Sequence, residues 1–209
     1  MSPYQVVKDF ESALCDYTGA KYAVTVTSCT AALLLAVKWN IEHLSRIHPH
    51  LRGCGFEFEI PDRTYVSVPM AILNAGGFVK FRKNEWLGEY NITPYNIWDC
   101  ARWFRKDMYR AGQMMCLSFH WTKQLAIGQG GAILHDNDEA DEWLRRARFD
   151  GRKEGVAPKD DSFTMIGHHC YLSPRDAAEG LSRLAVFKDT GQPLPNDDYP
   201  DLSLCEVFK

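Results

Sequence analysis

Strand-like and helix-like segments alternate along most of the chain, and this alternation limits the fold more than any other feature. Residues 21–27 are rich in Tyr and Val, which favours a strand, and a helix is predicted directly after it at 30–44. A second strand at 56–60 precedes a second helix at 66–74. Because alternation of this kind is typical of βαβ units, we predict an α/β fold with three α/β/α layers and a mainly parallel sheet.

The remaining elements are expected on either side of this region. A first helix is predicted from Ser2 to Tyr17, with Ser2 as the N-cap and Pro3 at the first helical position. Further strands are predicted at 78–81, 96–98, 114–119 and 132–135, and further helices at 139–149 and 174–188. The polar segment 150–161 is predicted to be a long loop.

The C-terminal residues have a different composition from the rest. From Thr190 onward the chain contains three prolines beside several aspartates, which predicts either a wrapping arm or a disordered end. We therefore expect one large domain at 1–189 and a tail at 190–209, and the hydrophobic fraction of 45% is ample for one packed core.

Charge and targeting patterns exclude several classes of protein. The net charge of −3 gives no general attraction to nucleic acid. We predict neither a signal peptide nor a membrane span, because the longest apolar run, 31–37, stops at Lys38.

Cysteine and histidine patterns bear on compartment and metal binding. The seven cysteines are scattered without a CxxC pair, which indicates free thiols in a reducing cytoplasm. Histidines gather at 43–50 and 168–169, but neither stretch has a recognised ligand spacing, so we predict no metal site.

The junction at Thr27 to Thr30 is the first candidate for chemistry. In an α/β sheet, ligands bind where strand carboxyl ends meet helix N-termini, and the hydroxyls of Ser28 and Thr30 with nearby backbone N–H groups suit a phosphate. Alternatively, Ser28 or Thr30 simply caps the following helix.

Five segments of the chain carry a family resemblance in their order as well as in their residues. They are 17–37 with Ser28-Cys29-Thr30, 60–77 with Tyr65, 97–102 with Asp99, 116–131 with SFHWTK, and 167–184 with His168-His169. Together they resemble the DegT/DnrJ/EryC1/StrS family of pyridoxal-phosphate (PLP) enzymes, best known as nucleotide-sugar aminotransferases. The resemblance implies the large-domain fold of PLP-dependent transferases.

The resemblance also implies roles for individual residues. Lys123 would be the Schiff-base lysine, and Asp99 would face the pyridine nitrogen, which keeps the cofactor an electron sink. Phosphate would be bound by Ser28, Thr30, Ser118 and the backbone N–H of Cys29, which replaces the usual glycine. Tyr65 would stack on the cofactor ring, or would be an ordinary core residue.

Two residues depart from the family pattern. Arg102 stands where relatives often have glutamine near the ring hydroxyl; it would stabilise the cofactor's phenolate, anchor a substrate carboxylate, or point into solvent. His169 stands where the family usually has an asparagine that reaches the phosphate of the neighbouring subunit, so the resemblance implies a homodimer with shared active sites.

The leading hypothesis for function is transamination from an amino acid to a keto-sugar-like or other carbonyl acceptor. The resemblance also implies that most of the family's smaller C-terminal domain is missing, which would leave an open site able to take a bulky acceptor, such as a carrier-bound group or modified nucleotide. Two alternatives stay open: a PLP-dependent decarboxylase or lyase acting on an amino-acid-like group, and a non-catalytic binding relative.

Overall fold

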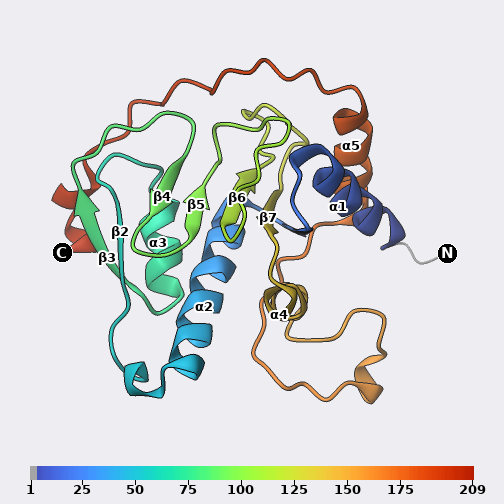
Figure 1. Cartoon of the computed structure of the whole chain (residues 1–209), viewed down its shortest axis with the longest axis horizontal. Helices are drawn as coiled ribbons and strands as arrows, with labels where there is room; N and C mark the ends of the chain where they lie inside the picture. The colour runs from blue at the N-terminus through green and yellow to red at the C-terminus, as the bar shows by residue number, and fades with distance from the viewer. Residues whose placement is uncertain (1–3) are drawn as a thin grey trace.

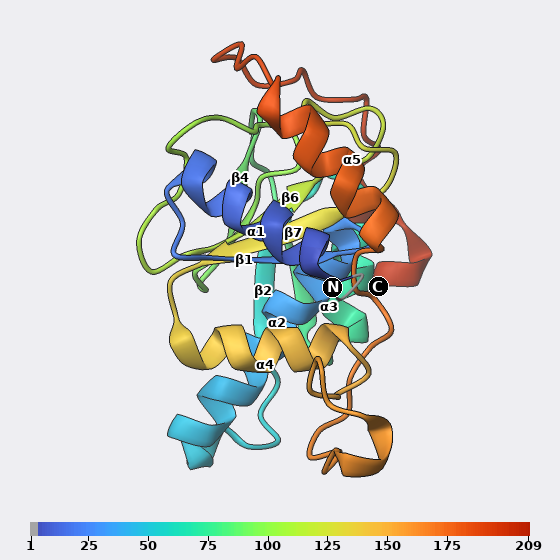
Figure 2. The same cartoon turned by 90° about the vertical axis from the view of Figure 1, so that its right-hand side faces the viewer.

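A computed structural model of the chain describes residues 4–209, and these residues form a sheet covered by helices on both faces (Figure 1). Figure 2 views the sheet close to edge-on, with α1 and α5 on one side and α2, α3 and α4 on the other. The predicted α/β/α layering is therefore confirmed. The predicted N-cap Ser2 and Pro3 lie outside the described residues.

The strands form one five-stranded sheet and one pair. The first has the order β1 (Tyr22–Val26), β7 (Gly131–His135), β6 (Met114–Ser118), β5 (Ile97–Asp99) and β4 (Tyr90–Ile92). The pair is β2 (Glu57–Pro61) and β3 (Phe78–Arg82), which an antiparallel bridge between Glu59 and Thr93 connects to the end of β4.

The sheet is mixed in its pairing. From the pairings, β1, β2, β3, β5 and β6 point one way and β4 and β7 the other. The common direction of five of the seven described strands agrees with the prediction, but three of the five pairings are antiparallel: β4 pairs with β5 in this way, and β7 lies antiparallel between β1 and β6. The reason is the connection from β6 to β7, which is a loop, whereas parallel neighbours need a long crossover that is usually a helix.

The helices lie close to their predicted ranges. They are α1 (Gln5–Thr18), α2 (Cys29–Ile47), α3 (Ser67–Asn74), α4 (Asp138–Arg148) and α5 (Pro174–Ala185), with short 3₁₀ turns at Pro49–Leu51, Pro158–Asp160, Leu202–Leu204 and Glu206–Phe208. The hydroxyl of Ser173 and the amide oxygen of Asn137 cap α5 and α4 by accepting backbone N–H bonds. Strand β4 was not predicted, because three residues are too few to show an alternating pattern.

Alternate residues of the strands enter two separate cores. Val24 and Ile133 pack among the residues under α2 and α3, whereas Ala23, Met115 and Leu134 pack under α1 and α5. This period of two is what a strand buried on both faces requires. No helix within residues 4–209 combines the length and apolar composition that a membrane span requires.

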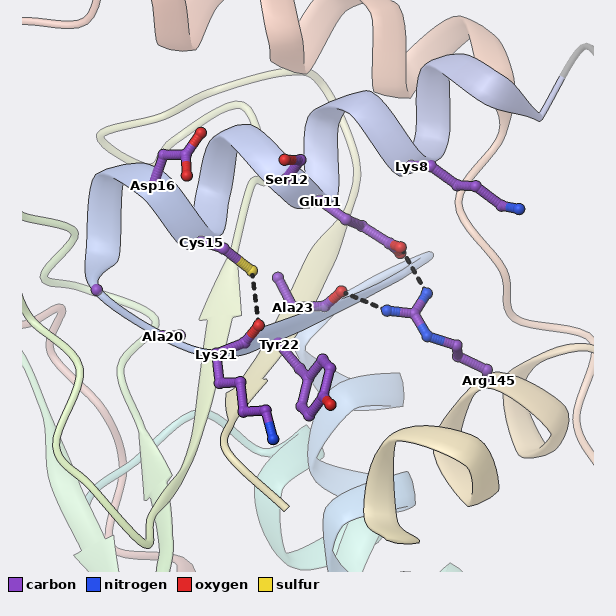
Figure 3. Close-up of a pocket in the computed structure, with 11 residues that line it drawn as sticks. Lys8, Glu11, Ser12, Cys15, Asp16, Ala20, Lys21, Tyr22, Ala23 and Arg145 are labelled. Carbon is purple, nitrogen blue, oxygen red and sulfur yellow. Dashed lines mark hydrogen bonds and ion pairs between the residues drawn. The ribbon is translucent and has the colours of Figure 1, made fainter. Parts of the chain in front are cut away.

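A buried ion-pair cluster joins α1, β1 and α4. Glu11 on α1 accepts hydrogen bonds from the Thr25 backbone N–H at 2.9 Å, from Arg148 at 2.5 Å and from Arg145 at 2.6 Å. Burial by itself raises the pKa of Glu11, but the Arg148 and Arg145 guanidiniums outweigh it and leave this pKa lowered. Figure 3 shows Glu11 and Arg145 pointing toward each other beside Ala23, in a hollow of about 470 Å³. We assign this cluster a structural role.

Residues after α5 cross the molecule instead of continuing as a helix. Figure 1 shows this segment running along one edge of the sheet from α5 to the side of β2 and β3. Leu202 is buried, its backbone N–H donates to the Asp62 carbonyl at 2.8 Å, and Phe208 packs against Phe81. Of the two predictions for this segment, the wrapping arm is the one observed.

Candidate active site

A pocket of about 530 Å³ lies at the carboxyl ends of β1, β5 and β6. Eight of the nine residues predicted for the site line it: Ser28, Cys29, Thr30, Tyr65, Asp99, Arg102, Ser118 and Lys123. Residues far apart in sequence meet here because strands that point the same way end at the same edge of the sheet.

The turn from β1 into α2 forms the first part of the pocket. The Ser28 hydroxyl accepts a hydrogen bond from the Ala31 N–H at 3.1 Å and so caps α2, while Thr30 shares a hydrogen bond of 2.7 Å with Ser67. The capping role weighed for Ser28 is therefore real. It leaves the Ser28 hydroxyl hydrogen available to an anion, which the N-terminus of a helix also favours.

Gly131 at the start of β7 packs directly against this turn. A Cβ atom at Gly131 would lie 2.5 Å from the Ser28 carbonyl carbon and 2.6 Å from the Cys29 nitrogen. Only glycine permits the two backbones to come this close, so β7 packs directly against the turn and supports it.

Lys123 lies in the loop that connects β6 to β7. Its backbone N–H donates to the His120 carbonyl at 2.8 Å, and three bonds of 2.9–3.0 Å hold the two sides of the loop together: Phe119 N–H to Gly130, Trp121 N–H to Gly128 and Ile127 N–H to Phe119. Burial and then the nearby Arg102 charge lower the pKa of Lys123, against the opposing effect of Asp99. A lowered pKa favours the neutral, nucleophilic amine.

Asp99 ends β5 and is 6% exposed. One carboxylate oxygen accepts the Ala101 N–H at 3.0 Å, and the other accepts the Tyr90 hydroxyl at 3.0 Å. Burial raises the pKa of Asp99, and the hydrogen bonds from Ala101 and Tyr90 oppose that rise. Asp99 and Lys123 thus influence each other's ionisation across one pocket.

Tyr65 lines the pocket just before α3 and remains 59% exposed. This exposure excludes the alternative that Tyr65 is an ordinary core residue of this chain. Its ring is available to a ligand.

Arg102 is buried, with 8% of its surface exposed, so the alternative that it points into solvent is wrong. Its guanidinium donates to Asp197 at 2.7 Å and 3.3 Å, to the Tyr199 hydroxyl at 3.2 Å and to the Pro195 carbonyl. Arg102 therefore lines the predicted pocket, but residues of the crossing segment already accept hydrogen bonds from both of its terminal nitrogens.

The pocket residues that were not foreseen include Trp86, Asp197 and Tyr199. The Trp86 and Tyr199 rings are nearly parallel, at 15° and 6.2 Å between centroids. Asn196 also donates to the Trp86 carbonyl. No short motif could have indicated these residues, because Trp86 lies in the connection from β3 to β4 and the other two lie in the crossing segment, and neither has a periodic pattern.

His169 is the one predicted residue that lies outside the pocket. Its side chain is 72% exposed and its Nδ1 lies 3.0 Å from Asp150. The predicted contact was with a cofactor in the neighbouring subunit, so it remains a prediction.

The cysteines and the residue types that commonly bind metals were also candidates for function. All seven cysteines are free thiols, as predicted. Among the residues that the structure describes, His, Cys, Asp and Glu form no group of three or more that could hold a metal ion.

Comparison with solved structures defines the class of fold. The chain superposes on the aminotransferase PseC of Helicobacter pylori, which is involved in pseudaminic acid biosynthesis, with a TM-score of 0.70 and 18% identity, covering 87% of this chain and 57% of that one. It superposes on the sugar aminotransferase CalS13 of Micromonospora echinospora with a TM-score of 0.68 and 19% identity, covering 87% and 61%. The fold is that of a PLP-dependent aminotransferase.

Sequence comparison identifies the family. The model of the DegT/DnrJ/EryC1/StrS aminotransferase family matches residues 1–81 and 100–192, and the chain belongs to this family. The UDP-4-amino-4,6-dideoxy-N-acetyl-beta-L-altrosamine transaminase of Campylobacter jejuni is 23% identical over 228 residues, covering 85% of this chain and 56% of the relative. The chain thus spans between half and two thirds of the length of these relatives.

Proposed function

We propose that this chain is the cofactor-binding large domain of a PLP-dependent aminotransferase, with the domain at 1–189 and the crossing segment at 190–209. The reaction would move an amino group from an amino acid to a keto-sugar-like or other carbonyl acceptor. The observation that carries the proposal is that Lys123, Asp99 and the N-terminus of α2 line one pocket. The sugar aminotransferases among the relatives support the same reaction class.

The residues present fit pyridoxal phosphate. The hydroxyls of Ser28, Thr30 and Ser118 beside a helix N-terminus suit a phosphate, and the buried Asp99 carboxylate suits a protonated ring nitrogen. A volume of about 530 Å³ also lies within the range of small-molecule and cofactor sites. When bound, the cofactor supplies an electrophilic carbon for an amino group and a ring that withdraws electrons from it.

Lys123 would act twice. Its amine, held by the β6–β7 loop, would anchor the cofactor covalently; when a donor amino group displaces it, the freed amine would take the donor's α-proton and return it to the cofactor's C4′ carbon. The lowered pKa of Lys123 supports this, because a general base must be neutral before it accepts a proton.

The other residues would bind and orient. Asp99 would hold the ring nitrogen's proton, and Tyr65 would cover one face of the ring. Ser28, the Cys29 backbone N–H, Thr30 and Ser118 would hold the phosphate.

We propose further that the protein acts as a homodimer in the cytoplasm. His169 is exposed and outside its own chain's pocket, as a residue that reaches a neighbouring subunit's phosphate must be. The free thiols agree with a reducing compartment.

The observation that favoured the decarboxylase or lyase alternative no longer supports it. It depended on Arg102 anchoring a substrate carboxylate, and Asp197 pairs with that guanidinium instead. Entry of a bulky acceptor must likewise pass the crossing segment at Asp197 and Tyr199.

A spectrum and one half-reaction test the proposal. Purified protein incubated with pyridoxal phosphate should absorb visible light, and borohydride reduction should add the cofactor's mass to the peptide that contains Lys123. Glutamate should then bleach the visible band and yield 2-oxoglutarate. A colourless protein without an adduct at Lys123 would contradict cofactor binding, and carbon dioxide release without 2-oxoglutarate would favour the decarboxylase.

A further inference from the structure

The hydroxyl of Tyr90 touches the carboxylate that the proposed function places against the cofactor ring. Strands β4 and β5 are antiparallel, and Tyr90 and Asp99 are directly opposed in their register. Opposed residues of an antiparallel pair project from the same face, so the strand pairing itself brings the hydroxyl to the carboxylate. The distance from the Tyr90 oxygen to Asp99 Oδ2 is 3.0 Å.

A second hydroxyl fixes the direction of this hydrogen bond. Thr64 Oγ1 lies 2.7 Å from the Tyr90 hydroxyl oxygen. An ionised Asp99 can only accept, so Tyr90 gives its single hydroxyl hydrogen to Asp99, and Thr64 must be the donor to Tyr90. The result is a buried chain of two hydrogen bonds that runs from Thr64 through Tyr90 to Asp99.

The two oxygens of Asp99 are held by different donors. Ala101 N–H binds Oδ1 and Tyr90 binds Oδ2, so rotation of the carboxylate about its Cβ–Cγ bond would break both bonds. Each oxygen keeps a free acceptor site for a further donor, such as a ring N–H.

Because Tyr90 is buried, its hydroxyl keeps its proton and remains a hydrogen-bond donor to Asp99. Tyr90 is 3% exposed, and burial followed by the neighbouring Asp99 charge raises its pKa well above the usual range. The phenol therefore keeps its proton whenever Asp99 is ionised. The titratable or charged groups that interact with Asp99 are Tyr90, Lys123, Arg102, Cys29, Cys100 and Cys116.

We propose that Tyr90, supported by Thr64, is a positioning residue that fixes the orientation of Asp99 and favours its ionised form before the cofactor binds. Its importance for catalysis rests on the proposed function. Tyr90 lies in residues 82–99, which the family model does not match, so the match with the family does not supply this role.

The substitution Tyr90→Phe removes one oxygen and keeps the ring that packs against Trp86. We expect the dissociation constant for pyridoxal phosphate, measured by equilibrium dialysis, to rise about tenfold, because a buried carboxylate loses a donor. Thr64→Val should act in the same direction and more weakly. The matched control is Tyr95→Phe, which removes a hydroxyl beside the same strand pair and leaves Asp99's contacts unchanged.

A double-mutant cycle separates positioning from general damage to the fold. In an Asp99→Ala background, Tyr90→Phe should change the dissociation constant less than about twofold, because the residue through which it acts is gone. An undiminished effect in that background would overturn the proposal, as would equal affinities of Tyr90→Phe and Tyr95→Phe.

A measurement without cofactor keeps this inference distinct from the proposed function. In protein with ¹³C-labelled aspartate, the Asp99 carboxyl resonance should titrate at higher pH in Tyr90→Phe than in wild type, and at an unchanged pH in Tyr95→Phe. Unchanged titration in Tyr90→Phe would overturn the role of Tyr90 even in a protein that binds the cofactor. A wild type that binds no pyridoxal phosphate would overturn the proposed function and leave this titration to decide the role of Tyr90.

Discussion

Two groups of side chains line the pocket, and they differ in how they are held. We call Ser28, Thr30, Ser118 and Lys123 the matched wall, because they lie in segments that the family model matches. We call Trp86, Asp197 and Tyr199 the unmatched wall, because they lie in residues 82–99 and 193–209, which it does not match. The matched wall is built on strand ends and a helix cap, whereas the unmatched wall is held by side-chain bonds to an irregular segment.

This difference separates the chemistry from the choice of substrate. Groups that must hold a cofactor to within a fraction of an ångström belong on rigid elements, and the matched wall has most of them; Asp99, which lies outside the matched residues, is held at the end of β5. Irregular segments tolerate changes in length and composition, so the unmatched wall is where relatives with one chemistry can differ in their acceptors.

The largest effect is expected in the matched wall. Lys123→Ala should remove the visible absorbance of the bound cofactor and lower the rate of 2-oxoglutarate formation from glutamate by about a thousandfold or more, since it deletes both nucleophile and base. Lys159→Ala, an exposed lysine far from the pocket lining, should leave both unchanged. Retained absorbance in Lys123→Ala would place the covalent anchor elsewhere.

The second effect concerns the ion-pair cluster around Glu11, which binds β1, the strand that leads to Ser28 in the matched wall. Glu11→Gln should destabilise the protein by about 2–3 kcal/mol, because it removes the more buried of the two carboxylates that pair with Arg148 and leaves only Glu154. Since the pKa of Glu11 is lowered in the folded protein, its stabilising contribution is present above the unfolded-state pKa and is lost as pH falls through the folded-state value. Urea melts of wild type and variant should therefore converge in acid; a constant difference at all pH values would disprove this role.

A smaller effect is expected in the unmatched wall. Asp197→Asn should leave the cofactor's dissociation constant within about twofold of wild type and strengthen glutamate binding severalfold, because it frees Arg102 for a carboxylate and removes a nearby negative charge. Stopped-flow titration of the half-reaction measures the change. Asp198→Asn, next in sequence, is the control; an equal effect from it would point to general electrostatics.

The smallest effect is expected from Tyr199→Phe, which removes the hydroxyl between Arg102 and Asp197 and keeps the ring near Trp86. Cofactor affinity should be unchanged and proteolysis within residues 190–200 should accelerate about two- to threefold, because two long, partly exposed hydrogen bonds are lost while Arg102 keeps its bonds to Asp197. Loss of cofactor affinity here would show that the two walls are not independent.

The matched wall could be predicted from the sequence because the segments that carry its residues resemble the family both in their residues and in their order along the chain. Ser28 follows a strand and begins a helix, and Lys123 follows Ser118 at a fixed spacing, so fold and chemistry reinforce each other. The positions of Tyr65, Asp99 and the phosphate-type hydroxyls in one pocket agree with that reasoning.

The unmatched wall could not be predicted because its positions depend on contacts between segments distant in sequence. Asp197 meets Arg102 across 95 positions, and nothing in the composition of the crossing segment indicates that contact. Arg102 was interpreted without this partner, so its occupied guanidinium was missed. The hydroxyl of Tyr90 was missed for the related reason that β4 is too short to be recognised, and its register with Asp99 was therefore unknown.

The antiparallel strand β7 has a further consequence for the lysine. Because β7 returns beside β6, the loop of residues 119–130 that carries Lys123 has both ends fixed on neighbouring strands, and backbone hydrogen bonds hold its two sides together. A parallel neighbour would have needed a long crossover, and the amine would then have been carried on a connection with more freedom. The reversal of one strand therefore raises the effective concentration of the amine at the pocket, and the entropy of placing it is lost when the protein folds instead of at each turnover.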